Sequence, residues 1–216
     1  MISINMKAPE SYALKKLAKV LVGAGLAFPL WYITFLTSFF NSFWYRITLS
    51  IAFLVAYATF VDKGYMLHEL RSIRLSHIGL GMISAVILYI LFLVSFMVMK
   101  PIFEGGVEQV YMLKFEAEPE SIAFILIFTS FGEEYFWRGF VQRGLARLYG
   151  RPLSISAVTA TYSLIHIPTL NIPLMLAAFI AGLYWGIFYA TTNSLWTVIT
   201  SHMIWTELVF ILLPLT

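Results

Sequence analysis

The chain has 216 residues, of which 60% are apolar and 12% charged, and its mean hydropathy is +0.84. This composition excludes an ordinary soluble domain, which needs a larger polar surface to stay in solution. The formal charge of +3 is small, and the basic residues are scattered between apolar segments, so a nucleic-acid-binding face is excluded as well. Cysteine is absent, and with it disulfides, thiolate nucleophiles and cysteine metal sites.

The N-terminal segment places four lysines, at positions 7, 15, 16 and 19, before a long apolar run. This order resembles a signal peptide, but the run is too long for one and lacks a small-residue cleavage site. We therefore expect an uncleaved signal anchor.

Long apolar segments follow one another along the whole chain, each long enough for a full or nearly full crossing of a bilayer core of about 30 Å. They predict an all-α fold, a polytopic transmembrane bundle of about seven spans, with residues 1–216 as a single membrane domain. Turn-forming residues separate them at 62–64, 100–101, 150–152, 168, 173 and 192–194. The predicted spans are residues 18–40, 47–61, 78–99, 121–142, 153–167, 173–191 and 195–213.

The segment from Tyr65 to His77 alternates apolar and charged residues at helical spacing. This pattern predicts an amphipathic helix on the membrane surface, with a simple linker as the alternative. His68 and His77 are expected to be surface residues.

Basic residues bias their loops to the cytoplasm, and here they gather on one side of the predicted spans. The sequence therefore predicts an integral, multi-pass protein of the cell membrane with a cytoplasmic N-terminus. The long loop on the other side is acidic, which indicates a solvated connector or, alternatively, a substrate-binding segment. Ten basic residues fall inside, namely Lys7, Lys15, Lys16, Lys19, Lys63, Arg71, Arg74, Arg143, Arg147 and Arg151. Outside are Arg46, Lys100 and Lys114, with Glu104, Glu108, Glu116, Glu118 and Glu120.

Two adjacent glutamates, Glu133 and Glu134, lie within one apolar segment, with Arg138 one helical turn on. A charge at mid-bilayer costs at least about 3 kcal/mol, so the pair needs a compensating interaction. Residues four apart share a helix face, which predicts an ion pair between Glu134 and Arg138 and leaves Glu133 pointing about 100° away. The alternative is a structural ion pair that fixes packing or sits at a snorkelling helix end.

Two further segments place a hydroxyl group four residues from a histidine: Tyr162 with His166, and His202 with Thr206. At about 1.5 Å per residue, Glu133 and His202 reach similar depths, roughly 12 and 10 Å from the inner face. His166 comes out at roughly 20 Å, so its helix must be tilted, short or sunk into the core for all to meet.

Such a set of residues fits the hydrolysis of a bond by water. A glutamate aided by a histidine can take a proton from water, while a second histidine stabilises the oxyanion. Alternatively, Glu133, His166 and His202 are ligands of a catalytic zinc that holds the water. Neither an HExxH zinc signature nor a GxSxG serine elbow is present.

In these motifs the chain resembles the CPBP family of intramembrane proteases, named for CAAX protease and bacteriocin-processing activity and also called the Abi family. Its first motif, EExxxR, is complete at 133–138. Its second, FxxxH, has tyrosine for phenylalanine at 162–166, and its third, HxxxN or HxxxD, ends in threonine at 202–206. Glycines at 182 and 186 and the turn at 193–196 are similar to the family's Gly-rich helix and the turn before its last motif; close helix packing also explains the glycines.

The resemblance covers residues 121–207, the expected protease-like core. It implies a membrane endopeptidase, a peptide hydrolase that cuts its substrate near the cytoplasmic face, either as a zinc metalloendopeptidase or as a metal-free glutamate protease. Its partners would be the lipid bilayer and a peptide or membrane-anchored protein substrate: a prenylated CAAX protein, a bacteriocin leader or another membrane peptide. By the resemblance, Glu133 would activate the water with help from His166.

The same resemblance implies that Glu134 and Arg138 support the site and that His202 and Thr206 bind the oxyanion. A threonine hydroxyl donates one hydrogen bond and is shorter than the family's asparagine amide. Glu207 lies about 100° around the helix from Thr206 and is a poor substitute. Two alternatives follow: a catalytically weakened immunity or scaffold protein of the same fold, or a proton-coupled transporter that uses the same intramembrane carboxylates and histidines.

Overall fold

Helices form nearly all of the chain. The computed structural model describes residues 8–215, and every regular element among them is helical. Lys7, counted above among the cytoplasmic basic residues, lies outside this range. The α-helices are α1 (Ala8–Leu36), α2 (Phe43–Arg71), α3 (Leu75–Tyr111), α4 (Pro119–Glu134), α5 (Arg143–Leu164), α6 (Ile172–Thr192) and α7 (Leu195–Glu207), with π-helical segments at Tyr135–Gln142 and Leu208–Leu212.

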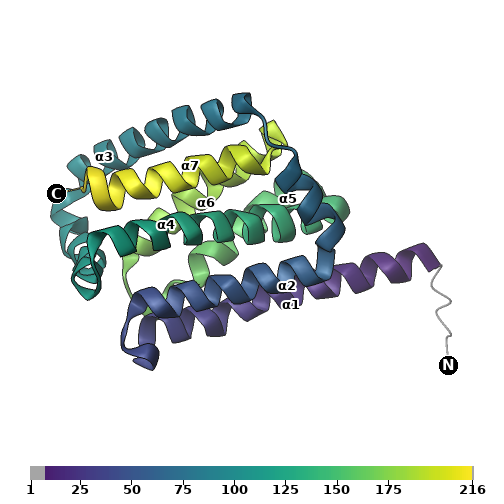
Figure 1. Cartoon of the computed structure of the whole chain (residues 1–216), viewed down its shortest axis with the longest axis horizontal. Coiled ribbons are helices and arrows are strands. Elements are labelled where there is room, and N and C mark those ends of the chain that lie inside the picture. The colour runs from purple at the N-terminus through teal and green to yellow at the C-terminus, as the bar shows by residue number, and fades with distance from the viewer. Residues whose placement is uncertain (1–7, 216) are drawn as a thin grey trace.

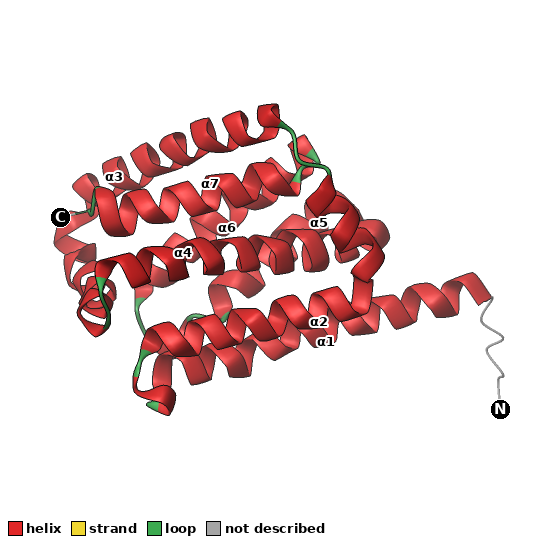
Figure 2. Ribbon diagram, in the orientation of Figure 1, coloured by secondary structure: helices red, strands yellow, loops and turns green. Residues whose placement is uncertain are grey.

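The helices lie side by side as a bundle in which most neighbours run nearly parallel or antiparallel (Figure 1). Helix α7 packs between α3 and α4, and α2 packs against both α1 and α4. Helices α5 and α6 pack against each other behind this layer. Short loops join the helices, as the small green segments in Figure 2 show. The bundle thus places α4, α5 and α7, which carry the three motifs, within reach of one another.

Five helical stretches in residues 8–215 are long and apolar enough to cross a membrane. The predicted all-helical membrane bundle is confirmed, but the predicted number of about seven spans is not. The expected spans 121–142 and 153–167 do not meet this standard. The first carries the charged residues Glu133, Glu134 and Arg138, and the second follows three arginines on α5. The five stretches are Leu14–Leu36, Phe43–Arg71, Leu75–Glu116, Ile172–Thr192 and Leu195–Leu212.

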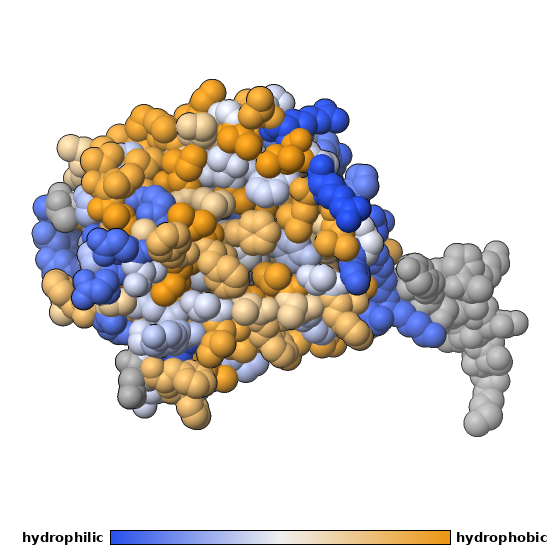
Figure 3. All heavy atoms as spheres, viewed as in Figure 1, coloured by the Kyte–Doolittle hydropathy of each residue, from blue (hydrophilic) through white to orange (hydrophobic). Residues whose placement is uncertain are grey.

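The surface of the bundle is largely apolar. In Figure 3 the middle of the visible face is mostly orange, and hydrophilic residues gather toward its two ends. Large apolar side chains of α1, α2 and α3, such as Leu21, Phe53 and Val98, are exposed instead of being packed inside. An apolar belt between two polar ends is the surface that a bilayer covers. The chain is a multi-pass membrane protein.

Two of the predicted helix breaks are bends or continuations. At Asp62 the backbone leaves helical geometry (φ −138°, ψ 42°), and α2 then goes on in a new direction to Arg71. Helix α3 passes through Pro101 without ending, because a proline removes only one backbone donor and the next turn can continue. The acidic loop expected after Lys100 is therefore helical up to Tyr111.

The amphipathic helix predicted for residues 65–77 is wrong in its extent. The last part of α2 supplies its first half, residues 72–74 are not helical, and His77 belongs to α3. Since α2 and α3 must both turn back into the bundle here, the chain has to leave helical geometry between them. His68 is exposed as predicted, whereas His77 is partly buried.

The remaining breaks lie where the sequence predicts them. Gly150 has a positive φ of 78°, which interrupts α5 after its first two turns. Asn193 is left-handed (φ 50°) and ends α6, and the hydroxyl of Ser194 then accepts a hydrogen bond from the backbone N–H of Thr197. This sharp turn starts α7 and sets the depth of His202 within the bundle.

The bundle has two distinct ends. The end formed by residues 62–74, 142–151 and 189–195 is called the basic end, because it carries Lys63, Arg71, Arg74, Arg143, Arg147 and Arg151. The opposite end, formed by residues 37–42, 112–120 and 213–215, is called the acidic end. One of its carboxylates has a structural role: Glu116 Oε2 accepts a 2.7 Å hydrogen bond from Phe43 N at the start of α2.

Candidate active site

A buried ion pair lies at the centre of the bundle. Arg138 Nη1 donates to Glu134 Oε1 at 3.0 Å, and both side chains are fully buried. The same oxygen atom accepts a 2.9 Å hydrogen bond from His202 Nδ1. The i,i+4 pair predicted from the sequence is therefore present, and it also holds a histidine from α7.

Arg138 links this centre to α6. Its Nη2 donates to the carbonyl oxygen of Gly182 at 2.9 Å. A Cβ atom at Gly182 would lie 3.1 Å from Tyr162 Cδ1 and 3.8 Å from Arg138 Nη2, so the missing side chain lets the three groups approach. Removing one member of a buried ion pair leaves the other charge uncompensated, and each charge here has a partner on another helix.

Glu133 points away from this pair and toward α5. Its Oε2 atom accepts a hydrogen bond from the hydroxyl of Tyr162. Glu133 is partly buried, whereas Glu134 is fully buried. The two neighbouring glutamates thus differ as their positions on the helix predict: one is enclosed by Arg138 and His202, and the other borders a cavity.

His166 lies in the turn after α5 and not within a span. Helix α5 ends at Leu164, and His166 is buried directly after it. Its Nδ1 lies 2.9 Å from the carbonyl oxygen of Tyr162, so Nδ1 carries the proton. Its Nε2 then accepts a 3.2 Å hydrogen bond from the indole N–H of Trp31. His166 lines the same cavity as Glu133 and His202, but both of its ring nitrogens are engaged.

His202 is held on two sides. Besides its bond to Glu134, its ring stacks on Trp185 with 3.8 Å between centroids. No hydrogen bond from Nε2 to another described residue is present, and His202 lines the same cavity as Glu133. This nitrogen is therefore available to a molecule in that cavity.

Thr206 does not present a free donor. Its hydroxyl donates to the backbone carbonyl of His202 at 2.9 Å and accepts a 3.2 Å hydrogen bond from Ser130. A threonine hydroxyl has one proton, and the helix backbone takes it here. The residue at the family's asparagine position thus faces the cavity with its hydrogen-bonding capacity largely used.

The cavity has a volume of about 170 Å³ and brings together four of the six predicted site residues. Liquid water occupies about 30 Å³ per molecule, so there is room for a few waters. Glu134 and Arg138 do not line the cavity and lie behind it. The four lining residues from the predicted site are Glu133, His166, His202 and Thr206.

From Glu133 the cavity extends toward the acidic end. Phe43 and Trp44, at the start of α2, line it, as does Leu113. A hollow beside it shares Leu113 and also includes the exposed Gln109. The site is thus connected with the acidic end of the bundle and not with the basic end.

Sequence reasoning missed several contributors to the site. The role of Tyr162 had a signal, since tyrosine replaces the phenylalanine of the second motif. Trp31, Ser130 and Trp185 had none: each contacts its partner across at least 16 positions in the sequence. Such contacts depend on how helices pack, which spacing within one helix does not reveal.

The proposed zinc ligands do not fit a metal ion in this arrangement. Within the part of the chain that the structure describes, no three His, Asp or Glu side chains come close enough to share one. His166 would have to give up Trp31 to free Nε2, and Glu133 is bound by Tyr162. A zinc site also needs ligand nitrogens that point at a common centre. The expectation of a zinc site at Glu133, His166 and His202 has no support in this geometry.

Comparison with known proteins gives one result for this region. Residues 117–207 match the family model described as type II CAAX prenyl endopeptidase Rce1-like. Searches of the curated proteins and of the solved structures gave no match. The matched segment begins just before α4, ends with α7 and includes all three motifs and the buried centre built from them. The resemblance drawn from the motifs is thereby confirmed: residues 117–207 are similar to the family described as type II CAAX prenyl endopeptidase Rce1-like.

Proposed function

We propose that the protein is an intramembrane endopeptidase in which Glu133 activates a water molecule for attack on a peptide bond. The observation that carries this proposal is the shared cavity of Glu133 and His202, each held by its own partners, within the Rce1-like segment. The cavity is lined mostly by apolar side chains and leaves space for the reacting water.

In this mechanism the carboxylate of Glu133 takes a proton from water, and the hydroxide attacks the carbonyl carbon of the substrate. Tyr162 holds the carboxylate in place through its hydroxyl. His202, when protonated, donates from Nε2 to the oxyanion, and Glu134 steadies the ring through Nδ1. Collapse of the intermediate breaks the C–N bond, and Glu133 returns the proton to the leaving amine.

Glu134 and Arg138 are positioning residues in this proposal. Their ion pair anchors His202 from α7 to α4 and to the Gly182 carbonyl on α6. The role of His166 differs from the one that the resemblance implies. Its two nitrogens are engaged, so it supports the cavity wall together with Trp31 unless that hydrogen bond opens.

The substrate class follows from the family description: a prenylated peptide with a CAAX-type end is the first choice. The test uses purified protein in proteoliposomes and a quenched fluorescent peptide whose cysteine is farnesylated, with an unprenylated twin. Wild type should cleave the prenylated peptide. Cleavage of neither peptide would contradict this substrate class.

Variants test the mechanism separately. Glu133→Gln should lower kcat by about 10²- to 10⁴-fold, since it removes the base while keeping the shape. His202→Gln should lower it by about 10²- to 10³-fold through loss of the oxyanion donor. Glu207→Gln is the matched control, a partly buried glutamate on α7 that does not line the cavity. Unchanged cleavage by Glu133→Gln would contradict the proposed mechanism.

Orientation decides on which side of the membrane the substrate is cut. The basic end is the one expected in the cytoplasm, yet the cavity extends toward the acidic end. A cytoplasmic N-terminus and cleavage near the cytoplasmic face are therefore incompatible if the substrate enters through this cavity. We propose the cytoplasmic N-terminus with entry from the opposite side. The chain has no cysteine, so single cysteines at Lys114 and Arg147 can be labelled in intact cells with an impermeant maleimide. Labelling of position 114 alone is expected.

One observation favours a second candidate, a catalytically weakened protein of the same fold that serves as an immunity or scaffold protein. The single proton of Thr206 is already donated to the backbone. Thr206→Asn would supply an amide with two donors at this position. A gain in cleavage would support a weakened enzyme, and continued inactivity in an inactive wild type would support the scaffold.

A further inference from the structure

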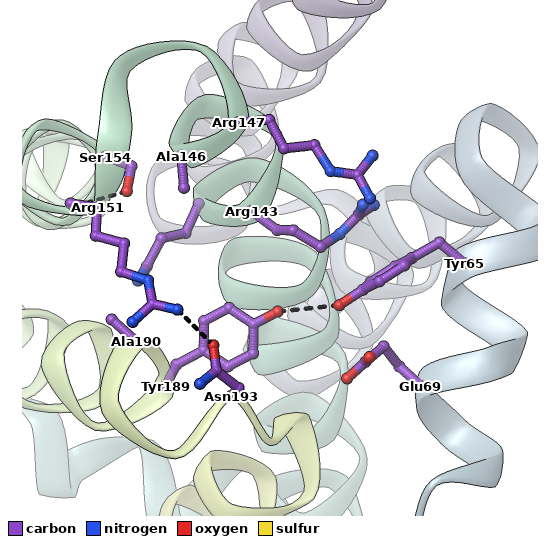
Figure 4. Close-up of a pocket in the computed structure, with 11 residues that line it drawn as sticks. Tyr65, Glu69, Arg143, Ala146, Arg147, Arg151, Ser154, Tyr189, Ala190 and Asn193 are labelled. Carbon is purple, nitrogen blue, oxygen red and sulfur yellow. Dashed lines mark hydrogen bonds between the residues drawn. The ribbon is translucent and has the colours of Figure 1, made fainter.

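A second cavity of about 330 Å³ lies at the basic end and shares no lining residue with the proposed catalytic cavity. It lies between the last turns of α2, the first turns of α5 and the end of α6 (Figure 4). Three arginines line it, Arg143, Arg147 and Arg151, against one carboxylate, Glu69. None of these groups has a part in the proposed hydrolysis.

One hydrogen-bond donor of a residue that lines this cavity, Arg143, has no partner among the described residues. Arg143 is only 8% exposed; its Nε donates to Gly139 O, and its Nη2 pairs with Asp62, but its Nη1 is buried and has no partner among the described residues. A buried guanidinium N–H without an acceptor is costly. Because Arg143 lines the cavity, a turn of its side chain toward the cavity would let an acceptor bound there remove that cost.

The other two arginines extend the same positive surface. Figure 4 shows Arg143 and Arg147 reaching toward Tyr65, whose ring centroid lies 3.3 and 5.5 Å from their Cζ atoms. Arg151 turns to Asn193 on the other side and donates to its Oδ1 at 2.9 Å. Arg147 and Arg151 are exposed, so a ligand can reach them from outside. Several guanidinium groups around one hollow match the oxygens of a phosphate group.

We propose that this basic-end cavity, lined by Arg143, Arg147 and Arg151, is a binding site for a phosphate group. In a membrane the basic end lies at the level of the lipid headgroups, where basic pockets between helices bind anionic lipids. The same chemistry also suits a free phosphate in the adjoining solution. The proposal is independent of the proposed protease function because the two cavities share no residue.

The alternative is that the arginines only fasten α5 to its neighbours. Glu69 and the unpartnered Oε1 atom of Gln142 also line the cavity, and both repel a phosphate oxygen. They lie on the walls formed by α2 and by the π-helical segment, whereas Arg147 and Arg151 lie on α5. A structural role alone predicts no ligand, so binding separates the two possibilities.

The test measures binding to the purified full-length protein in neutral detergent. Native mass spectrometry records retained phosphatidylglycerol, with phosphatidylcholine as the uncharged reference, and a thermal scan compares sodium phosphate with sodium chloride at equal ionic strength. The double variant Arg147→Gln/Arg151→Gln should lower the retention of phosphatidylglycerol, or the phosphate-induced shift of the melting temperature, at least about tenfold. Both residues are exposed, so folding should survive the change.

The matched control is Arg71→Gln/Arg74→Gln, which removes the same charge from exposed positions of the basic end outside the cavity. If the cavity variant, but not the control variant, loses phosphatidylglycerol, the source of the phosphate group is a lipid headgroup. If the cavity variant loses only the phosphate-induced thermal shift, the source is free phosphate. Equal loss in both double variants, or no binding in either arm by the wild type, overturns the proposal.

Discussion

The buried centre around Glu134 and the basic-end cavity use the same kinds of side chain in opposite ways. At the centre, Arg138 is fully buried and bonds to a carboxylate and a carbonyl on different helices. At the basic end, Arg147 and Arg151 are exposed. A buried atom without a partner among the described residues occurs in both regions: Nη1 of Arg143 at the basic end, and Nε of Arg138 and Oε2 of Glu134 at the centre. Glu134 and the arginines of both regions lie within one stretch, residues 134–151.

The difference follows from the surroundings. A charge inside an apolar bundle must find its partners within the protein, because no water can replace them. A charge at the bundle end can leave donors for solvent, lipid or ligand. The centre is therefore expected to be rigid and sensitive to single substitutions, and the basic end to be tolerant and responsive to ions.

The largest effect is expected from Arg138→Leu. It leaves the Glu134 carboxylate buried beside His202 alone, which should lower the free energy of unfolding by about 3–5 kcal/mol. An SDS titration in mixed micelles measures it. Arg147→Leu, at the exposed end, should unfold close to wild type, and equal losses in the two variants would refute the comparison.

A double variant sharpens the same point. Glu134→Leu/Arg138→Leu removes both charges, so no uncompensated charge stays in the bundle. It should unfold with a smaller loss than Arg138→Leu alone. A loss equal to or above the single variant's would mean that packing, and not charge pairing, holds this centre.

Next in size is Tyr162→Phe, which restores the phenylalanine of the family motif. It removes a hydroxyl that donates to the Glu133 carboxylate, and hydrogen bonds to charged groups contribute about 1.5–3 kcal/mol. The control is Tyr189→Phe in the basic-end cavity, where the hydroxyl lies 3.4 Å from that of Tyr65 and bonds weakly. The unfolding midpoint of Tyr189→Phe should lie closer to that of wild type than the midpoint of Tyr162→Phe does. The reverse order would count against the prediction.

A smaller effect is expected from Trp31→Phe, which removes the donor to His166 Nε2. A neutral hydrogen bond contributes about 1 kcal/mol. Combining it with His166→Gln in a double-mutant cycle measures the coupling between α1 and the turn after α5. A coupling energy near zero would show that the two rings merely pack together.

The smallest effect is expected from a change in salt concentration, to which the two regions should respond differently. Raising ionic strength from about 0.1 M to 1 M shortens the screening length from about 10 to 3 Å. Phosphate-group binding at the basic end should weaken several-fold, while the stability difference between wild type and Arg138→Leu should shift by less than about 0.5 kcal/mol. Binding titrations and SDS titrations at both salt concentrations measure this, and a salt-sensitive centre would contradict its burial.

Helical spacing was enough to predict the Glu134–Arg138 pair, because both partners lie on one face of one helical stretch. It was also enough to predict that Glu133 would point elsewhere. The turns at Gly150 and Asn193 could be predicted because these residue types tolerate positive φ. Each of these features depends on residues close in sequence.

Counting spans from apolar segments was less successful. Two expected spans do not meet the length and hydropathy standard of a membrane-crossing helix. Residues 121–142 carry the site glutamates, and residues 153–167 follow the arginines of α5. Neighbouring helices shield the buried part of these segments, so they do not need the hydropathy of a lipid-exposed helix. An apolar run alone does not show whether lipid or protein surrounds a helix.

By itself, the sequence determined the helical membrane character of the chain, the family resemblance of its motifs and the local geometry of the Glu133-Glu134 pair. The tertiary structure alone decided that His166 bonds to Trp31, that the proton of Thr206 goes to the helix backbone, and that the cavity leads to the acidic end. The physical reason is the distance along the sequence over which each effect acts. Spacing between nearby residues fixes which side chains share a face of one helix. Only packing between helices fixes which faces meet and which donors are left free.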